Sequence, residues 1–166
     1  MKTTAVVLTL GEDVSTDDIY PGRFMATVLP SETPQYAFAD RPQFNARLIK
    51  GEIPPGSVLV AGRNFGCGSS REQAASALKG WDLTVVAAGI ARIFLQNAVN
   101  LGLRLAICPE IEVFEGDELE LFPDRIVNLS TRRTFRVVPL PRARQDILDA
   151  GGLIPYVRKR LLKKTV

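Results

Sequence analysis

The stretch that decides the fold runs from residue 57 to residue 108 and reads SVLVAGRNFGCGSSREQAASALKGWDLTVVAAGIARIFLQNAVNLGLRLAIC. Three short apolar runs typical of buried strands lie within it, at residues 57–61, 83–88 and 103–107. The two segments that separate these runs are predicted to be helices, from about Ser70 to Lys79 and from about Ile90 to Leu101. Apolar strands that alternate with helices predict a βαβαβ unit with a parallel sheet and right-handed crossovers.

The segments on either side of this stretch add further elements. Before it, a strand is expected at residues 5–10, an acidic and turn-rich loop at residues 11–18, and short helices near residues 34–39 and 44–49. After it, the pattern predicts strands at residues 113–122, 125–129 and 134–138, followed by helices at residues 145–150 and 156–164. We therefore expect an α/β fold in which a parallel unit is joined by additional β strands. Since the sequence offers no linker, residues 1–166 are expected to form a single domain.

The composition excludes several classes of protein. Hydrophobic residues make up 46% of the chain and charged residues 23%, which is typical of a globular protein. The formal charge of +3 is too small to indicate binding to nucleic acid or to a membrane. The basic excess gathers in a C-terminal segment, which we interpret as a solvated helix end. The sequence has neither a long apolar run nor the pattern of a signal peptide, so we expect no membrane span.

The sequence also lacks the residues of several kinds of catalytic site. It has no histidine, which excludes Ser-His-Asp and Cys-His machinery and any zinc site built on histidine. Its two cysteines, Cys67 and Cys108, cannot supply the four thiolates of an iron–sulfur cluster, so no metal is expected in this chain. Two cysteines do not make a disulfide framework either, which indicates a reducing compartment and a cytoplasmic protein.

The loop after the first parallel strand, from Gly62 to Arg71, is the strongest candidate for a ligand site. Open parallel sheets bind ligands at the carboxyl ends of their strands, and this loop leads into the N-terminus of a helix. Its glycines let backbone N–H groups turn toward a ligand, and Ser69, Ser70 and Arg71 add further donors. The loop therefore predicts a site for a carboxylate or a phosphate.

Three other interpretations of this loop stay open when only its residues are considered. A dinucleotide loop needs a glycine where Arg71 stands and an acid after the second strand, where the sequence has Ala87-Ala88. A nucleophilic Cys67 would be activated by the helix end, but no histidine stands behind it. Ser69 and Glu72 have the spacing of a capping box, so Ser69 also fits the role of a helix cap.

Residues 62–74, GRNFGCGSSREQA, resemble the signature of the aconitase swivel domain, above all in the stand-alone small subunits of the isopropylmalate isomerase and homoaconitase family. Residues 13–23, DVSTDDIYPGR, resemble that family's T-D-x-I-x-P-G-R segment, and residues 91–103, ARIFLQNAVNLGL, resemble its A-R-I-F-x-x-N-A-x-N-x-G-L helix. The order and spacing fit from about residue 6 to residue 157. Ala88-Gly89-Ile90 departs from the family's K-S-F, which we interpret as a packing variant. The resemblance implies a swivelling β/β/α-type domain.

The resemblance also implies a hydro-lyase, which dehydrates a hydroxy-polycarboxylate and rehydrates it at the neighbouring carbon. Carried over by motif position, Ser69 would be the base that removes the proton α to a carboxylate. Ser70 and Arg71 would bind a substrate carboxylate and stabilise the serine alkoxide. Asp17 matches the family's active-site acid in the T-D segment, whereas the residues alone favour a turn acid or a helix cap.

The resemblance bears on the choice of substrate as well. Arg23 lies in the shared P-G-R segment, so it would contact the substrate without selecting among substrates. In the family, the loop after this segment helps to choose the side group of the substrate, and here it reads Phe24-Met25-Ala26-Thr27. Met25 and Ala26 carry no charge, which favours an aliphatic side group over the extra carboxylate of homoaconitate.

Finally, the resemblance implies that this chain is half of an enzyme. In the family, a 4Fe-4S cluster in a large subunit acts as Lewis acid on the departing hydroxyl, which fits a chain that has no ligands for a cluster. We expect a hetero-oligomer with such a cluster-bearing large subunit, acting on isopropylmalate in leucine biosynthesis. One alternative is the small subunit of a homoaconitase or of another substituted-malate hydratase. Another is a non-catalytic module that binds an anion at the glycine loop.

Overall fold

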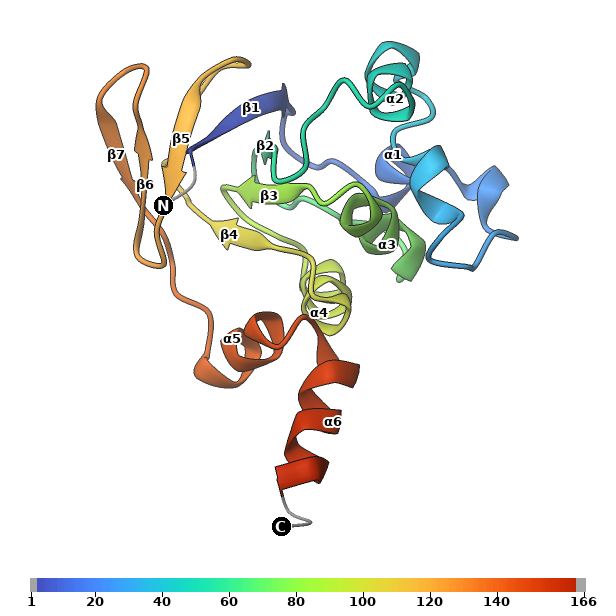
Figure 1. Cartoon of the computed structure of the whole chain (residues 1–166). Helices are drawn as coiled ribbons and strands as arrows, with labels where there is room; N and C mark the ends of the chain where they lie inside the picture. The colour runs from blue at the N-terminus through green and yellow to red at the C-terminus, as the bar shows by residue number, and fades with distance from the viewer. Residues whose placement is uncertain (1–2, 164–166) are drawn as a thin grey trace.

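The computed structural model describes residues 3–163, which contain one seven-stranded sheet (Figure 1). Its strands are β1 (Thr3–Thr9), β2 (Val58–Ala61), β3 (Thr84–Ala87), β4 (Leu105–Ile107), β5 (Glu118–Leu121), β6 (Arg125–Asn128) and β7 (Arg133–Arg136). They lie in the order β4-β3-β2-β1-β5-β6-β7. The strands from β4 to β1 pair in parallel, whereas the pairs from β1 to β7 are antiparallel. The predicted α/β fold, a parallel unit with additional β strands, is confirmed.

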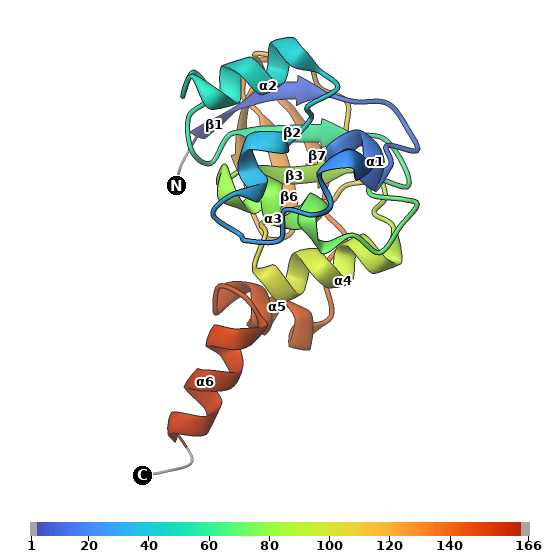
Figure 2. The ribbon, with the colours of Figure 1, turned by 90° about the vertical axis from the view of Figure 1, so that its right-hand side faces the viewer.

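The helices between Thr16 and Leu101 cover one face of the parallel strands, and the antiparallel strands curl across the other face (Figure 2). The helices are α1 (Thr16–Ile19), α2 (Pro42–Ile49), α3 (Glu72–Gly80), α4 (Arg92–Leu101), α5 (Arg142–Asp149) and α6 (Leu153–Lys163). Two 3-10 helices, η1 (Gly22–Phe24) and η2 (Thr33–Tyr36), lie between α1 and α2. Because β1 to β4 are parallel, the loops that follow β1, β2 and β3 all leave the sheet at the same edge.

The sequence of β2 shows why both faces of the parallel half are buried. Leu59 and Ala61 belong to the core under the helices, whereas Val58 and Val60 join a second core with Ile126 of β6. Successive side chains of a strand point to opposite faces, so a strand covered on both faces needs a continuous apolar run. The same reasoning applies to β3, in which every residue is buried.

Three elements differ from the predictions. Residues 11–18, predicted as a loop, run into α1, which begins at Thr16 because Ser15 and Asp18 form a reciprocal capping box. The strand expected at residues 113–122 begins only at Glu118, because the chain turns at Gly116, whose φ is +90°. The short helix expected near residues 34–39 is the 3-10 helix η2.

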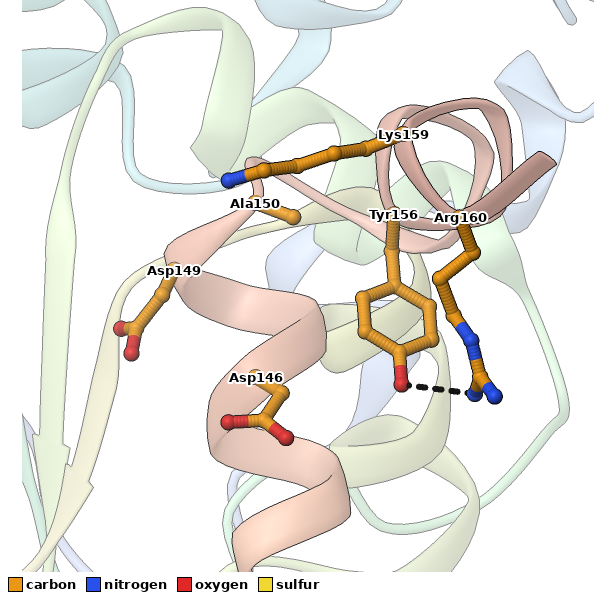
Figure 3. A pocket seen from close by; sticks show the side chains of 6 residues that line it. All are labelled: Asp146, Asp149, Ala150, Tyr156, Lys159 and Arg160. Carbon is orange, nitrogen blue, oxygen red and sulfur yellow. Dashed lines mark hydrogen bonds between the residues drawn. The ribbon is translucent and has the colours of Figure 1, made fainter. Parts of the chain in front are cut away.

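The C-terminal helices stand apart from the sheet. The helices predicted at residues 145–150 and 156–164 are α5 and α6, and both begin earlier than predicted. Lys164, the last residue of the second prediction, lies outside the described residues. Figures 1 and 2 show α6 projecting away from the body of the molecule. A hollow of about 390 Å³ between α5 and α6 is lined by Asp146, Asp149, Ala150, Tyr156, Lys159 and Arg160 (Figure 3). Within residues 3–163, the helices are too short or too polar to cross a membrane.

Candidate active site

The glycine loop between β2 and α3 is anchored by Phe65. This side chain is fully buried and meets the ring of Phe94 edge-on, with the ring centroids 5.2 Å apart. Its N–H donates to the carbonyl of Gly89 at 2.9 Å, and its carbonyl accepts the N–H of Ala91 at 2.9 Å, so the loops after β2 and β3 are tied together. Gly66 follows with φ +78°, and a Cβ there would collide with Phe94. The glycine at this position is therefore required by the close approach of α4.

The segment after β1 runs beside the glycine loop. The N–H of Asp13 donates to the carbonyl of Arg63 at 2.9 Å, and the N–H of Gly66 donates to the carbonyl of Val14 at 2.7 Å. The N–H of Thr16 then donates to the carbonyl of Cys67 at 2.8 Å. These bonds continue the parallel pairing of β1 with β2 beyond the strands. They bring the two motifs, residues 13–23 and 62–74, to the same edge of the sheet.

Ser69 is exposed and lies against Thr16. The N–H of Ser69 donates to the Thr16 hydroxyl at 3.2 Å, and the two hydroxyl oxygens are also 3.2 Å apart. The alternative in which Ser69 caps the next helix is wrong: α3 begins at Glu72, Arg71 occupies the N-cap position, and no side chain among the described residues caps the helix. Ser69 stands two residues before the N-cap, and its hydroxyl contacts Thr16 and not an N–H group of α3. Its hydroxyl is thus placed by Thr16 and faces solvent.

Arg71 forms an ion pair with Asp17. Its Nη1 donates to the Asp17 carboxylate and to the Tyr20 carbonyl, the latter at 3.2 Å, and the Asp17 carboxylate also accepts the Gly22 N–H at 2.8 Å. The hydrogen bond from Arg71, followed by that from Gly22, holds the pKa of Asp17 below its usual range. Asp17 does not cap α1, since Ser15 does. It therefore serves to hold the guanidinium of Arg71.

The two contacts are adjacent in the structure. Ser69 bonds to Thr16 and Arg71 bonds to Asp17, so alternate residues of the loop meet consecutive residues of α1. Ser70, which lies between them, is exposed, and its carbonyl accepts a hydrogen bond from Asn97 Nδ2 at 3.2 Å. Ser69, Ser70 and Arg71 thus form one short, anchored segment at the carboxyl end of the parallel strands.

The residues predicted to contact the substrate side group lie next to this segment. Met25 and Ala26 are exposed, and the Met25 carbonyl accepts a hydrogen bond from Gln73 in the first turn of α3 at 3.4 Å. Arg23 is exposed as well, but Asp40 accepts from both of its terminal nitrogens, at 3.1 and 2.5 Å. The structure therefore brings residues 25–26 to the start of α3, whereas it directs the fork of Arg23 toward Asp40.

Three anchoring residues were missed from the sequence. Thr16 and Asn97 lie inside the motifs at residues 13–23 and 91–103, but no function was predicted for them. Their partners in the glycine loop can be identified only once the fold is known. Tyr20 is buried, and its hydroxyl donates toward the carbonyls of Phe24 at 3.1 Å and Thr27 at 3.5 Å, which holds the side-group loop. Burial raises the pKa of this hydroxyl. Residues 24–27 are therefore braced from the protein interior.

The described residues do not fit a metal cluster. Within residues 3–163, His, Cys, Asp and Glu side chains nowhere gather in a group of three or more that could hold a metal ion. Cys67 and Cys108 are both free thiols, and burial raises the pKa of Cys108 to about 11. An iron–sulfur cluster needs several thiolates, so this chain by itself does not provide a cluster site. The hollow between α5 and α6 shares no lining residue with the segment around Ser69.

Comparison with known proteins gives consistent matches. Residues 49–107 match the family described as the aconitase C-terminal domain. A 3-isopropylmalate dehydratase small subunit from Moorella thermoacetica is 43% identical over 159 residues, which cover 92% of this chain and 93% of that protein. An isopropylmalate/citramalate isomerase small subunit from Methanocaldococcus jannaschii is 42% identical, with 91% and 90% covered. A crystal structure of 3-isopropylmalate dehydratase from the same organism superposes with a TM-score of 0.86 at 36% identity, covering 99% of this chain and 98% of that one.

Proposed function

Because this chain belongs to the family of 3-isopropylmalate dehydratase small subunits, we propose that it supplies the base and the carboxylate contacts of a hydro-lyase. The observation that carries this proposal is the anchored segment of Ser69, Ser70 and Arg71, which presents two hydroxyls and a fixed cation at the carboxyl end of the sheet. The enzyme would interconvert isopropylmalate isomers in leucine biosynthesis, through an unsaturated intermediate.

In the proposed reaction, Ser69 acts as the base. Its Oγ, as an alkoxide, takes the proton from the carbon next to a substrate carboxylate. The electrons of that C–H bond become the second bond of a C=C, while the C–O bond on the neighbouring carbon breaks and hydroxide leaves. Rehydration at the other carbon completes the isomerisation. Serine is a weak base in water, so the alkoxide needs a nearby cation, and Arg71 is the charged group of this segment.

The carboxylate contacts fall to Arg71 and Ser70. A guanidinium can hold a carboxylate through two parallel N–H···O bonds, a geometry that the ammonium of lysine cannot copy. Asp17 and the Tyr20 carbonyl both accept from Nη1, so they hold one end of that guanidinium before substrate arrives and leave Nη2 for the substrate. Asp17 therefore acts through Arg71, and in this proposal Arg23 contacts the substrate from the rim only after it leaves its ion pair with Asp40.

The substrate we propose is isopropylmalate. The supporting observation is that Met25 and Ala26, beside the start of α3, offer the side group no charge. A substrate with an additional carboxylate, such as that of a homoaconitase, would lack a partner at these positions. One relative is named for both isopropylmalate and citramalate, so the assay should compare both substrates with homoaconitate.

We also propose that a large subunit completes the site. The relatives are named as small subunits, which implies a hetero-complex. In our proposal the large subunit carries a 4Fe-4S cluster, since the sequence of this chain contains only two cysteines and no histidine. We further propose that residues 1–166 form one domain that acts in the cytoplasm. The antiparallel pairing of β1 with β5 joins the two halves of the sheet, and both cysteines are free.

Replacement of Ser69 by alanine in the assembled enzyme tests the proposal. We expect kcat to fall by about 10²- to 10⁴-fold, the usual contribution of a positioned base, with KM nearly unchanged. The thermal midpoint should fall only slightly, because the loss is one partly buried hydroxyl contact and the Thr16 hydroxyl keeps its contacts with the Ser69 backbone. Ser130→Ala serves as the control, since the Ser130 hydroxyl accepts the Glu118 N–H at 3.0 Å, at the antiparallel end of the sheet. If the two variants lose the same activity, Ser69 is not the base.

A further inference from the structure

Thr16 is buried at the centre of the site. It is the first residue of α1, its side chain is 2% exposed, and its N–H is bonded to Cys67 of the glycine loop. Its hydroxyl lies 3.2 Å from Ser69 N, 3.2 Å from Ser69 Oγ and 3.4 Å from the Ser69 carbonyl oxygen. Within residues 3–163, all three polar contacts of this hydroxyl are therefore made with Ser69.

The geometry limits where the hydrogen of the Thr16 hydroxyl can go. A threonine hydroxyl has one hydrogen to donate and two lone pairs that accept. The Ser69 N–H occupies one lone pair, so the hydrogen of Thr16 can go to Ser69 Oγ or to the Ser69 carbonyl. The contact with Oγ is the shorter one, and a charged oxygen is the stronger acceptor. When Ser69 loses its proton, the hydrogen of Thr16 is thus directed to the alkoxide.

We propose that Thr16 is the positioning residue of Ser69: it fixes the rotamer of the hydroxyl and donates a hydrogen bond to the alkoxide. This inference rests on the proposed role of Ser69 as the base. The bond from Thr16 approaches from the protein interior, which leaves the exposed side of Ser69 Oγ for the substrate proton. In this proposal, Arg71 supplies the positive charge that stabilises the alkoxide, and Thr16 fixes the orientation of Ser69 Oγ.

The structure offers a matched control at Thr33. This threonine is fully buried, and its hydroxyl lies 2.9 Å from the hydroxyl of Ser76 in α3. The pair has the same chemistry as Thr16 with Ser69, but it joins η2 to α3 and lies outside the two motifs. Loss of the Thr33 hydroxyl therefore measures what a buried Thr–Ser bond contributes to folding alone.

The test compares Thr16→Ser, Thr16→Ala, Thr16→Val and Thr33→Val in the assembled two-subunit enzyme. The measurements are the thermal midpoint, kcat, KM and the kinetic isotope effect with deuterium on the carbon that Ser69 deprotonates. We expect Thr16→Ala and Thr16→Val to lower kcat by about 10- to 100-fold, the range of one charge-assisted hydrogen bond, with KM within about 2-fold. Thr16→Ser should keep kcat within about 3-fold of the unmodified enzyme. The isotope effect in Thr16→Ala should be at least as large as in the unmodified enzyme.

The outcomes separate the proposal that Thr16 positions Ser69 from the proposal that Ser69 is the base. Thr33→Val should lower the thermal midpoint as much as Thr16→Val does, while its kcat stays within about 2-fold. If Thr16→Val does not fold, Thr16→Ser and Thr16→Ala carry the comparison, because they differ only in the hydroxyl. Equal kcat in these two variants, or a smaller isotope effect in Thr16→Ala, overturns the role of Thr16. If Ser69→Ala itself keeps its turnover, the proposed function fails instead.

Discussion

Replacement of Arg71 by lysine tests how much of the site depends on the shape of the guanidinium. The side chain of Arg71 is only 17% exposed, and its Nη1 serves both the Asp17 carboxylate and the Tyr20 carbonyl. Its buried Nε has no hydrogen-bond partner within residues 3–163. Lysine keeps the charge but offers one compact ammonium group. With Nη1 given to both anchors and Nε buried, Arg71 keeps Nη2 for a substrate carboxylate, and a single ammonium group cannot hold both anchors and also place a donor there.

The expected fall in kcat/KM follows from the number of hydrogen bonds that the substitution removes. One hydrogen bond to a charged group contributes about 1.5–3 kcal/mol, and about 1.4 kcal/mol corresponds to a factor of ten. Loss of one such bond in Arg71→Lys should lower kcat/KM by about 10- to 150-fold. Arg71→Ala loses the charge as well, so we expect a fall of about 10³-fold or more. Stability should change little in both variants, because the Asp17 side chain left behind is 62% exposed and can be hydrated.

The assay is steady-state kinetics of the assembled enzyme, with the thermal midpoint measured in parallel. Arg104→Lys is the control, because Arg104 donates to both the carboxylate and the carbonyl of Asp82, at 2.7 and 3.1 Å, and pairs at the surface. We expect that control to stay within about 2-fold of the unmodified enzyme. If Arg71→Lys is as active as Arg104→Lys, the fork of Arg71 does not bind the substrate, and its carboxylate contact has to be sought elsewhere.

Three further predictions concern protonation, thiol reactivity and substrate choice. The pKa of Asp17 is lowered chiefly by its hydrogen bond with Arg71, so its carboxylate stays charged until the pH falls through that lowered pKa. We expect the profile of kcat/KM between pH 5 and 8 to have the same limbs in Asp17→Asn as in the unmodified enzyme, and a limb that disappears in this variant would contradict the ion pair. An alkylating reagent at pH 8 should modify the partly exposed Cys67 and spare Cys108, which is buried and has a pKa of about 11. Cys108 should react only after the chain is denatured, and equal labelling of both cysteines in the native protein would refute this prediction. Ala26→Arg should weaken turnover of isopropylmalate and improve that of homoaconitate, and an unchanged preference would show that residues 24–27 do not select the side group.

The parallel half of the fold could be predicted because its sequence carries a strong signal. Continuous apolar runs such as residues 58–61 occur where both faces of a strand are covered, and Gly102 at φ +73° ends α4 as a left-handed cap. The antiparallel strands were harder to delimit, because β5 and β7 have four residues each, of which only one is buried. In such short segments, the pairing partner decides where the strand begins.

The site could be predicted only in part. The motif residues Ser69, Ser70 and Arg71 lie together as expected, since they are neighbours along the chain. Their contacts with Thr16 and Asp17 depend on the extension of the β1–β2 pairing, which no local pattern indicates. The capping-box interpretation of Ser69 was wrong for the same reason. Ser69 and Glu72 have the sequence spacing of a capping box, but the contact with Thr16 lies outside the helix, which begins only at Glu72.

The exposure of the site explains why the proposed activity needs a partner. Ser69 and Ser70 face solvent, and the Asp17 carboxylate is largely hydrated. A serine alkoxide in contact with water would take a proton from the solvent before it met a substrate carbon, because water screens the charge of Arg71. The contacts of Ser69 with Thr16 and of Arg71 with Asp17 fix geometry, but they do not exclude water. A large subunit that covers this edge of the sheet would supply the missing low-dielectric surroundings, so in our proposal the same surface must serve both as half of an active site and as half of an interface.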